Sequence, residues 1–229
     1  MPDSKELEKV LKINFHNPAL LEQALVHSSY INENPSTSIG HNERLEFLGD
    51  AVLDYIVAEK LYRDYPDIAE GEMTRLRASL VRRETLARIA GDIRLGTYLY
   101  MGKGEEATGG RNKIPNLAGA LEALIAAVYL DLGQAAARDM IIRLYTEEWD
   151  KLTRGGAVID YKSRLQQIVQ SRFQEIPVYR LVSETGPDHD KQFEVEVLVN
   201  SKVTGSGTGK SKKMAETEAA RLALKRLTE

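Results

Sequence analysis

Apolar residues recur every three or four positions through the first two thirds of the chain, which is the spacing of helices with one buried face. The clearest such segment is residues 43–65, which Pro66 ends. Its apolar strip consists of Leu45, Leu48, Val52 and Leu53. The same spacing predicts helices over residues 4–13, 17–32, 115–130 and 134–152, and one that begins at Glu70. We therefore expect an all-α domain over residues 1–153.

The pattern changes near the C-terminus. Residues 191–199 alternate between apolar and polar side chains, which is typical of a half-buried strand. Flanking segments predict a helix over 160–173, strands that begin at Pro177 and Lys202, and a last helix that Ser211 opens. The small apolar face of that last helix comprises Ala215, Ala219, Ala220, Ala223 and Leu227. A small α+β domain of order α-β-β-β-α is thus expected over residues 159–229, after a glycine-containing flexible linker at 154–158.

Carboxylates line the central predicted helix beside its apolar strip. Glu43, Glu46 and Asp50 fall at positions i, i+3 and i+7, with Asp54 one turn further. Such neighbours repel each other by a few tenths of a kcal/mol per pair (about 0.2–0.5). The row is therefore either a solvated acidic face or a set of ligands for a hard cation. Spacing alone does not separate these two interpretations.

Composition narrows the class of protein. The 229-residue chain has no cysteine, which excludes disulfides and cysteine-based sites and suits a cytoplasmic protein. No apolar run approaches the length needed to span a bilayer, and no secretion signal is evident, so we expect no membrane association. Residues 1–156 carry 19 Lys and Arg against 24 Asp and Glu, whereas residues 157–229 carry 12 against 10. The acidic part suits a metal and the basic part suits phosphates.

The segment ERLEFLGD at residues 43–50 resembles the signature of the ribonuclease III family. Residues 17–33, 69–87 and 119–133 are similar to other helices of that family, in the same order. The tail from Asp160 resembles the double-stranded-RNA-binding domain that follows the nuclease in bacterial members. The resemblance covers almost the entire chain.

The resemblance implies an endoribonuclease that hydrolyses double-stranded RNA, leaves 5′-phosphate and 3′-hydroxyl ends, and processes ribosomal or messenger precursors. Glu46, Asp50 and Glu122 would be the catalytic residues and hold Mg²⁺, with Mn²⁺ as a possible substitute and no small-molecule cofactor. Glu43 and Glu70 match positions at the edge of the cleft. The alternative for Glu122 is the solvent side of an apolar helix.

One position departs from the family pattern. The family places an aspartate three residues before the glutamate that matches Glu122, and here that position is Gly119. Asn116 lies about two thirds of a turn off the face of Glu122 and cannot easily replace it. A water can fill the vacancy at Mg²⁺. The alternative function is a double-stranded-RNA-binding protein with weak or no cleavage, and Gly119→Asp is then expected to raise activity at low magnesium.

The resemblance also implies partners. Gln166 and His189 match minor-groove contacts to double-stranded RNA, and the cluster Lys210, Ser211, Lys212 and Lys213 matches phosphate contacts at a helix start. A solvated helix start is the alternative for that cluster. Phe47 matches a residue that inserts into the partner subunit of a homodimer, although its spacing equally suits a core position.

Two further segments remain ambiguous in the sequence. Arg75, Arg77, Arg82 and Arg83 either form a solvated basic face, contact RNA phosphate, or pair with the acidic helix. The glycine-rich segment 101–113 lacks the spacing of a phosphate-binding P-loop. We expect it to be a flexible, partly basic loop on an RNA-facing edge.

Overall fold

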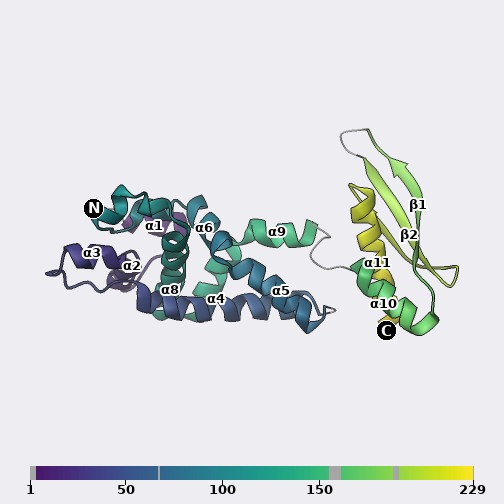
Figure 1. The fold of residues 1–229 in the computed structure, drawn as a ribbon, viewed down its shortest axis with the longest axis horizontal. Coiled ribbons are helices and arrows are strands. Elements are labelled where there is room, and N and C mark those ends of the chain that lie inside the picture. Colours follow the sequence, from purple (N-terminus) through teal and green to yellow (C-terminus); the bar gives the residue numbers. More distant parts are fainter. Residues whose placement is uncertain (1–3, 67, 155–160, 188–190, 229) are drawn as a thin grey trace. The chain divides into compact units, whose positions relative to one another are not determined.

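A computed structural model of the chain describes residues 4–66, 68–154, 161–187 and 191–228 (Figure 1). Contacts between residues divide the chain into two compact units, Met1–Thr146 and Glu147–Glu229, and each is described by itself. The predicted linker at 154–158 lies outside the described residues except for Arg154, where a helix ends.

The first unit is built from helices, as predicted. Its elements are α1 Ser4–Leu11, α2 Pro18–Ala24, α3 Ser28–Glu33, α4 Glu43–Asp64, α5 Glu70–Val81, α6 Arg83–Asp92, η1 Leu95–Tyr98, α7 Lys103–Ala107, η2 Gly110–Asn112 and α8 Ile114–Leu144. Helix α9, Thr146–Arg154, follows directly, and its residues from Glu147 onward fall in the second unit. The central predicted helix corresponds to α4, and its strip residues Leu45, Val52 and Leu53 are buried.

Helices α4 and α8 cross in the core of this unit (Figure 1). The crossing is close because Gly49 faces the backbone of Glu122: a Cβ atom added to Gly49 would lie 1.8 Å from the Glu122 carbonyl oxygen. Helix α8 also packs against α6 and α2. Gly133 interrupts its helical geometry at φ 83°, which explains why the sequence predicts two helices on either side of this residue.

Helix α8 also corrects the expectation about apolar length. Among the described residues it is one helix that is long and apolar enough to cross a membrane by length and composition. In the sequence, Glu122 lies within this helix, so its apolar run is not continuous. Just over half of its most apolar window, 56%, is buried within the structure, and this is the usual character of a core helix.

The predicted helix over 17–32 is wrong, because the chain leaves helical geometry between α2 and α3. Val26 forms an isolated parallel bridge with Tyr100. The amide of His27 donates to the Tyr100 carbonyl at 3.0 Å, and the amide of Tyr100 donates to the Leu25 carbonyl at 2.9 Å. His27 then caps α3 by accepting the amide of Ser29 at its Nδ1. These partners lie far along the chain and replace the local helical hydrogen bonds.

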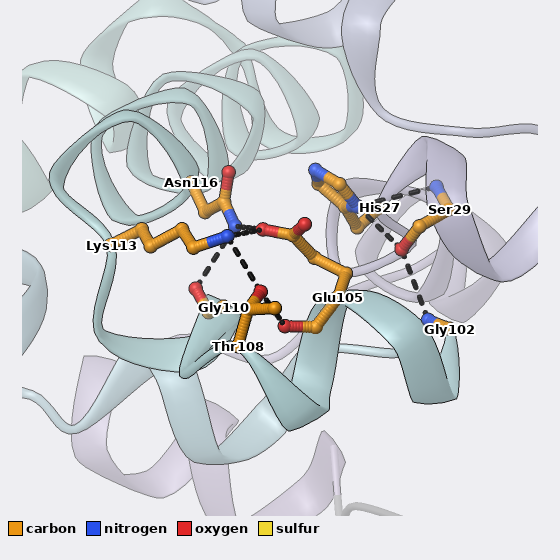
Figure 2. Close-up of polar contacts among 8 residues, drawn as sticks. All are labelled: His27, Ser29, Gly102, Glu105, Thr108, Gly110, Lys113 and Asn116. Carbon is orange, nitrogen blue, oxygen red and sulfur yellow. Dashed lines mark hydrogen bonds and ion pairs between the residues drawn. The ribbon is translucent and has the colours of Figure 1, made fainter.

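The glycine-rich segment 101–113 is also not the open loop that its composition suggests. It folds into α7 and η2, and side chains fasten it (Figure 2). Glu105 Oε1 accepts Lys113 Nζ and Asn116 Nδ2, both at 2.9 Å. Arg111 donates to the carbonyls of Gly96 and Leu99. Arg111 and Lys113 are therefore engaged within the unit and are not presented as free cations for RNA, whereas Lys103 of the same segment is exposed.

The second unit has the predicted α-β-β-β-α order. Its elements are α10 Tyr161–Phe173, β1 Val178–Thr185, β2 Gln192–Val199, β3 Lys202–Gly209 and α11 Lys212–Thr228. The strands form one antiparallel sheet of order β1-β2-β3. Alternate residues of β2, namely Val195, Val197 and Val199, are buried. Val197 and Val199 pack with Leu165 and Val169 of α10 and with Ala219, Ala220 and Ala223 of α11.

Strand β3 and helix α11 approach each other closely at three glycines of the strand. A Cβ atom added to Gly205 would lie 2.4 Å from the Ala219 carbonyl oxygen. The corresponding distance for Gly207 is 2.3 Å, to the amide nitrogen of Ala219, and for Gly209 it is 2.7 Å, to the amide nitrogen of Ala215. Three alternate glycines therefore allow the backbone of the strand to touch the backbone of the helix.

Candidate active site and RNA-binding surface

The crossing of α4 and α8 gathers three of the predicted site residues. Glu46 and Asp50 come from α4, one on each side of Gly49 in the sequence, and Glu122 comes from the α8 turn that Gly49 contacts. Asp50 is exposed, whereas Glu46 and Glu122 are half-buried. The apolar faces of the two helices fix the crossing, and the carboxylates lie at its edge.

Burial and neighbouring negative charge disfavour the ionised form of Glu122 and Glu46. Burial, followed by the negative charges of Asp50 and Glu46, raises the pKa of Glu122 to about 7. Burial is also the main cause that raises the pKa of Glu46. The positive charge that opposes both shifts is Arg83, at the first turn of α6. Among the four arginines that the sequence left ambiguous, Arg83 is thus the one that acts on the acidic cluster.

A divalent cation suits this set of donors. Within the described part of the chain, the carboxylates of Glu46, Asp50 and Glu122 accept no hydrogen bond and form no ion pair. Nor do any three or more His, Cys, Asp or Glu side chains among the described residues converge closely enough to enclose an ion. Unpaired, mutually repelling carboxylates at a half-buried crossing are the chemistry that a hard cation neutralises. By the chemistry of their donor atoms these residues suit a divalent cation, and binding one would require the three carboxylates to draw closer together.

Asp54 adds a fourth carboxylate that sequence reasoning did not select. Its negative charge contributes to the raised pKa of Glu122. Its Oδ1 atom is shielded from solvent and has no hydrogen-bond partner among the described residues. The sequence shows that Asp54 follows Asp50 by one helical turn. It does not show that the Asp54 carboxylate is shielded from solvent, which is the feature that marks it as part of the cluster.

Gly119 lies directly against Glu46. A Cβ atom added to Gly119 would come within 2.6 Å of the Oε2 atom of Glu46. Asn116 does not occupy this place, since its side chain donates to Glu105 and to the Gly110 carbonyl, both at 2.9 Å (Figure 2). The sequence prediction that Asn116 does not replace the missing ligand agrees with these contacts.

The two second-rank glutamates lie in different surroundings. Glu43 is exposed on the first turn of α4, and its charge acts on Glu46. Glu70 begins α5, where it accepts the Thr74 hydroxyl at 3.0 Å and lines a hollow beside Tyr62. Because Tyr62 is roughly 24 Å along α4 from Glu46, the structure of this single chain does not bring Glu70 to the cluster.

Phe47 points outward from α4. Its side chain is 82% exposed, so the interpretation as a core residue is wrong. Tyr55 and Tyr62 on the same helix are 53% and 72% exposed. A shallow hollow lined by Ala51, Val52, Tyr55, Tyr129 and Gln134 lies beside them. An exposed aromatic row of this kind is typical of a protein contact surface.

The predicted RNA contacts of the second unit lie on α10 and at the start of α11. Gln166 is exposed on α10, in a hollow that Ser163, Gln167, Gln170 and Ser171 also line. Lys162 Nζ forms an ion pair with Glu216 at 2.6 Å, which ties the first turn of α10 to the first turns of α11. Arg172 donates to the Leu227 carbonyl at the other end, so α10 and α11 run in the same direction and Gln166 lies one turn beyond the Lys162–Glu216 pair. His189 lies outside the described residues.

The predicted phosphate cluster is exposed at this helix start. Ser211 caps the helix, since its Oγ accepts the amide of Met214 at 3.2 Å. Lys212 Nζ lies 5.8 Å above the centre of the Phe193 ring, and Lys210 and Lys213 are exposed beside it. Backbone N–H groups, the helix dipole and three lysines make this end attractive to phosphate.

The fold and the site define a two-unit protein: a helical unit with a carboxylate cluster, and an α-β-β-β-α unit with a basic helix start. Residues 17–148 match the family profile described as "Ribonuclease-III-like", and residues 161–227 match the "Double-stranded RNA binding motif". The chain is 54% identical to "Ribonuclease 3" of Dehalococcoides mccartyi (strain ATCC BAA-2266 / KCTC 15142 / 195), over 98% of this chain and 94% of that protein.

Other relatives agree. "Ribonuclease 3" of Natranaerobius thermophilus is 45% identical, over 99% of this chain and 97% of that protein. Among solved structures, the nuclease domain of ribonuclease III from Campylobacter jejuni is 39% identical, with a TM-score of 0.59, covering 63% of this chain and 97% of that chain. The chain belongs to the ribonuclease III family and is a ribonuclease, a hydrolase.

Proposed function

We propose that this protein is an endoribonuclease that cleaves double-stranded RNA with the help of Mg²⁺, for which Mn²⁺ can substitute. The observation that carries the proposal is the unpaired cluster of Glu46, Asp50 and Glu122 at the α4–α8 crossing, where burial and mutual repulsion raise the pKa of Glu122 to about 7. The RNA-binding motif in the second unit supports the choice of substrate. Products with 5′-phosphate and 3′-hydroxyl ends, and a role in processing RNA precursors in the cytoplasm, belong to the same proposal.

The residues have separate tasks in this proposal. Glu46, Asp50 and Glu122 hold the metal, with Asp50 and Glu122 as the catalytic pair. When bound, the metal neutralises the scissile phosphate and lowers the pKa of a bound water. Arg83 is the cation whose positive charge acts on the cluster, and it would attract the same scissile phosphate. Gln166, His189 and the Lys210–Lys213 cluster hold the duplex through shape and backbone contacts.

A homodimer is part of the proposal. The Campylobacter jejuni structure is described as having a region involved in dimer formation. In this chain, the exposed row of Phe47, Tyr55 and Tyr62 on α4 supports a second copy as the partner. Two copies with one acidic cluster each would cut the two strands of one duplex.

The experiment is cleavage of a long double-stranded RNA by the purified chain, titrated with Mg²⁺, beside the Glu122→Gln variant as a control. We expect short duplex products from the native chain and none from the variant. Tight RNA binding without cleavage, even at high Mg²⁺, would contradict the proposal. It would favour the alternative of a double-stranded-RNA-binding protein whose site is disabled at Gly119.

A further inference from the structure

The backbone conformation at Gly119 does not require a glycine. It lies within regular helical geometry of α8, since the interruption in that helix is at Gly133. Glycine in a helix interior costs about 1 kcal/mol relative to alanine. The residue is buried, so no solvent-facing role accounts for it. The reason for glycine must therefore lie in the space beside its Cα atom.

That space is filled by one carboxylate. The three atoms nearest to a Cβ added at Gly119 all belong to Glu46: Oε2 at 2.6 Å, Cδ at 2.8 Å and Oε1 at 3.1 Å. Distances under 3 Å are not tolerated by real Cβ atoms. Any side chain at position 119 must therefore displace the carboxylate of Glu46. Because that group is the far end of a flexible side chain, it can move without disturbing the helices.

The position of Glu46 matters because of what lies one turn further on α8. Residues 119 and 122 share a helix face at i, i+3 spacing. A carboxylate that rests on Gly119 is therefore next to Glu122 on that face. The charge of Glu46 is accordingly one of the causes that raise the pKa of Glu122.

We propose that Gly119 is a positioning residue for the metal site: its bare Cα lets the Glu46 carboxylate lie against α8, so that Glu46 and Glu122 present two carboxylates on one helix face. Glu46 thus supplies from α4 the oxygen ligands that α8 itself lacks at position 119. The inference rests on the proposed metal-dependent function. In this inference, the glycine contributes to metal binding and does not disable the site.

The first test is Gly119→Ala in the full-length chain. The added methyl displaces Glu46 and brings no ligand, so Mn²⁺ binding measured by electron paramagnetic resonance without RNA should weaken about tenfold, as for other residues that orient ligands. The melting temperature of the metal-free variant should not fall, because alanine favours the helix. A variant that binds Mn²⁺ as tightly as the native chain would overturn the inference. So would parallel losses of stability and binding, because they indicate a purely structural role.

A double-mutant cycle shows whether Gly119 acts through Glu46. In a Glu46→Ala background, Gly119→Ala should leave Mn²⁺ affinity unchanged, because no carboxylate remains to be displaced. An equal loss in both backgrounds would overturn the inference. Failure of the native chain to bind Mn²⁺ at all would instead remove the metal-dependent function, and this inference with it.

Gly119→Asp completes the set and revises the expectation from sequence alone. An aspartate displaces Glu46 but puts another carboxylate in the same space. Mn²⁺ affinity should therefore remain close to that of the native chain and well above that of Gly119→Ala. Mn²⁺ affinity as low as that of Gly119→Ala would count against the inference. A large gain in affinity over the native chain would also count against it, because it would mean that Glu46 does not fill the space beside Gly119.

Discussion

Glu122 lies where the fold disfavours its charge. Half-buried beside Asp50 and Glu46, it has a pKa of about 7 in place of the ordinary 4.5. In the absence of metal, the folded state therefore holds a proton between these two values that the unfolded state has lost. The free energy of unfolding must then fall as pH rises through this window. A cation at the site reverses the trend, because it favours the charged form.

Glu122→Gln should therefore stabilise the metal-free protein at high pH. Glutamine keeps the shape of the side chain and carries no charge. Between about pH 5 and pH 8, the free energy of unfolding of the native chain should therefore fall by about 2 kcal/mol more than that of the variant. Urea denaturation at a series of pH values in a chelating buffer measures this difference. Glu70→Gln is the control, because that carboxylate is exposed and outside the cluster. Identical pH profiles for the native and Glu122→Gln chains would show that Glu122 ionises normally.

The same protonation should govern metal binding. Below about pH 7 the neutral Glu122 contributes no charge to the site. Mn²⁺ affinity of the native chain should accordingly rise as pH increases through 7, with protons released on binding. Isothermal titration calorimetry in buffers of different ionisation enthalpy detects that release. Binding without proton release near pH 6 would contradict the assignment of Glu122 as a ligand.

At the scale of elements, the site depends on how closely α4 and α8 approach. Gly49 sets that distance, because it faces the Glu122 carbonyl with no room for a side chain. Unlike the contact at Gly119, this one is with rigid backbone and cannot be relieved by a rotamer change. The two glycines thus have different tasks: Gly49 lets the helices cross, and Gly119 lets a carboxylate lie in the crossing.

Gly49→Ala should separate the helices. We expect the free energy of unfolding to fall by about 3 kcal/mol, in the range of overpacked cores, with loss of metal binding as a consequence. Gly91→Ala on α6 is a matched control, because no atom lies within 4 Å of its added Cβ. That control should be unchanged or slightly more stable. Chemical denaturation followed by circular dichroism compares the three chains, and equal stability of the Gly49→Ala and native chains would refute the close crossing.

The sequence predicts the elements better than their contacts. Periodic segments such as α4 and α11 follow from local spacing, and so does the α-β-β-β-α order. The break after α2 does not, because it depends on Tyr100, which lies far along the chain. The segment 101–113 has the composition of a loop, but Glu105 and Lys113 give it a fixed structure. The approach of Glu46 to Gly119 requires the helix crossing, which no local pattern contains.

The molecule as a whole separates its charges between two units. The acidic cluster is in the first unit, and the exposed lysines at the start of α11 are in the second. In the proposed function, binding of the duplex and attack on its phosphates fall to different units, so that repulsion between the carboxylates and RNA is offset elsewhere in the chain.

Replacement of Lys212 and Lys213 with alanine should weaken double-stranded-RNA binding and flatten its dependence on salt. Each lost phosphate contact reduces the slope of log K against log salt by about one unit. Electrophoretic mobility shifts at several salt concentrations give both values. The control replaces Lys225 and Arg226, at the opposite end of the same helix. If the two double replacements lower RNA affinity equally, α11 acts only through its net charge and not through a specific cluster at its start.

Phe47→Ser should weaken the proposed homodimer. Loss of an exposed aromatic anchor at the centre of an interface typically costs about 2 kcal/mol or more. Sedimentation equilibrium should show an increased monomer fraction for this variant. Val10→Ser, at an exposed apolar position on α1, should leave the distribution unaltered. A native chain that sediments as a monomer at all concentrations would exclude the dimer.

The contact between β3 and α11 has a consequence for how this protein can vary. Gly205, Gly207 and Gly209 leave no gap between strand and helix for even one methyl group. Ala215, Ala219 and Ala223 on the helix are fully buried. A saturation mutagenesis library selected for folding should therefore show intolerant positions every second residue along the strand and every fourth along the helix. Neighbouring exposed positions such as Ser206 and Thr208 should accept most replacements.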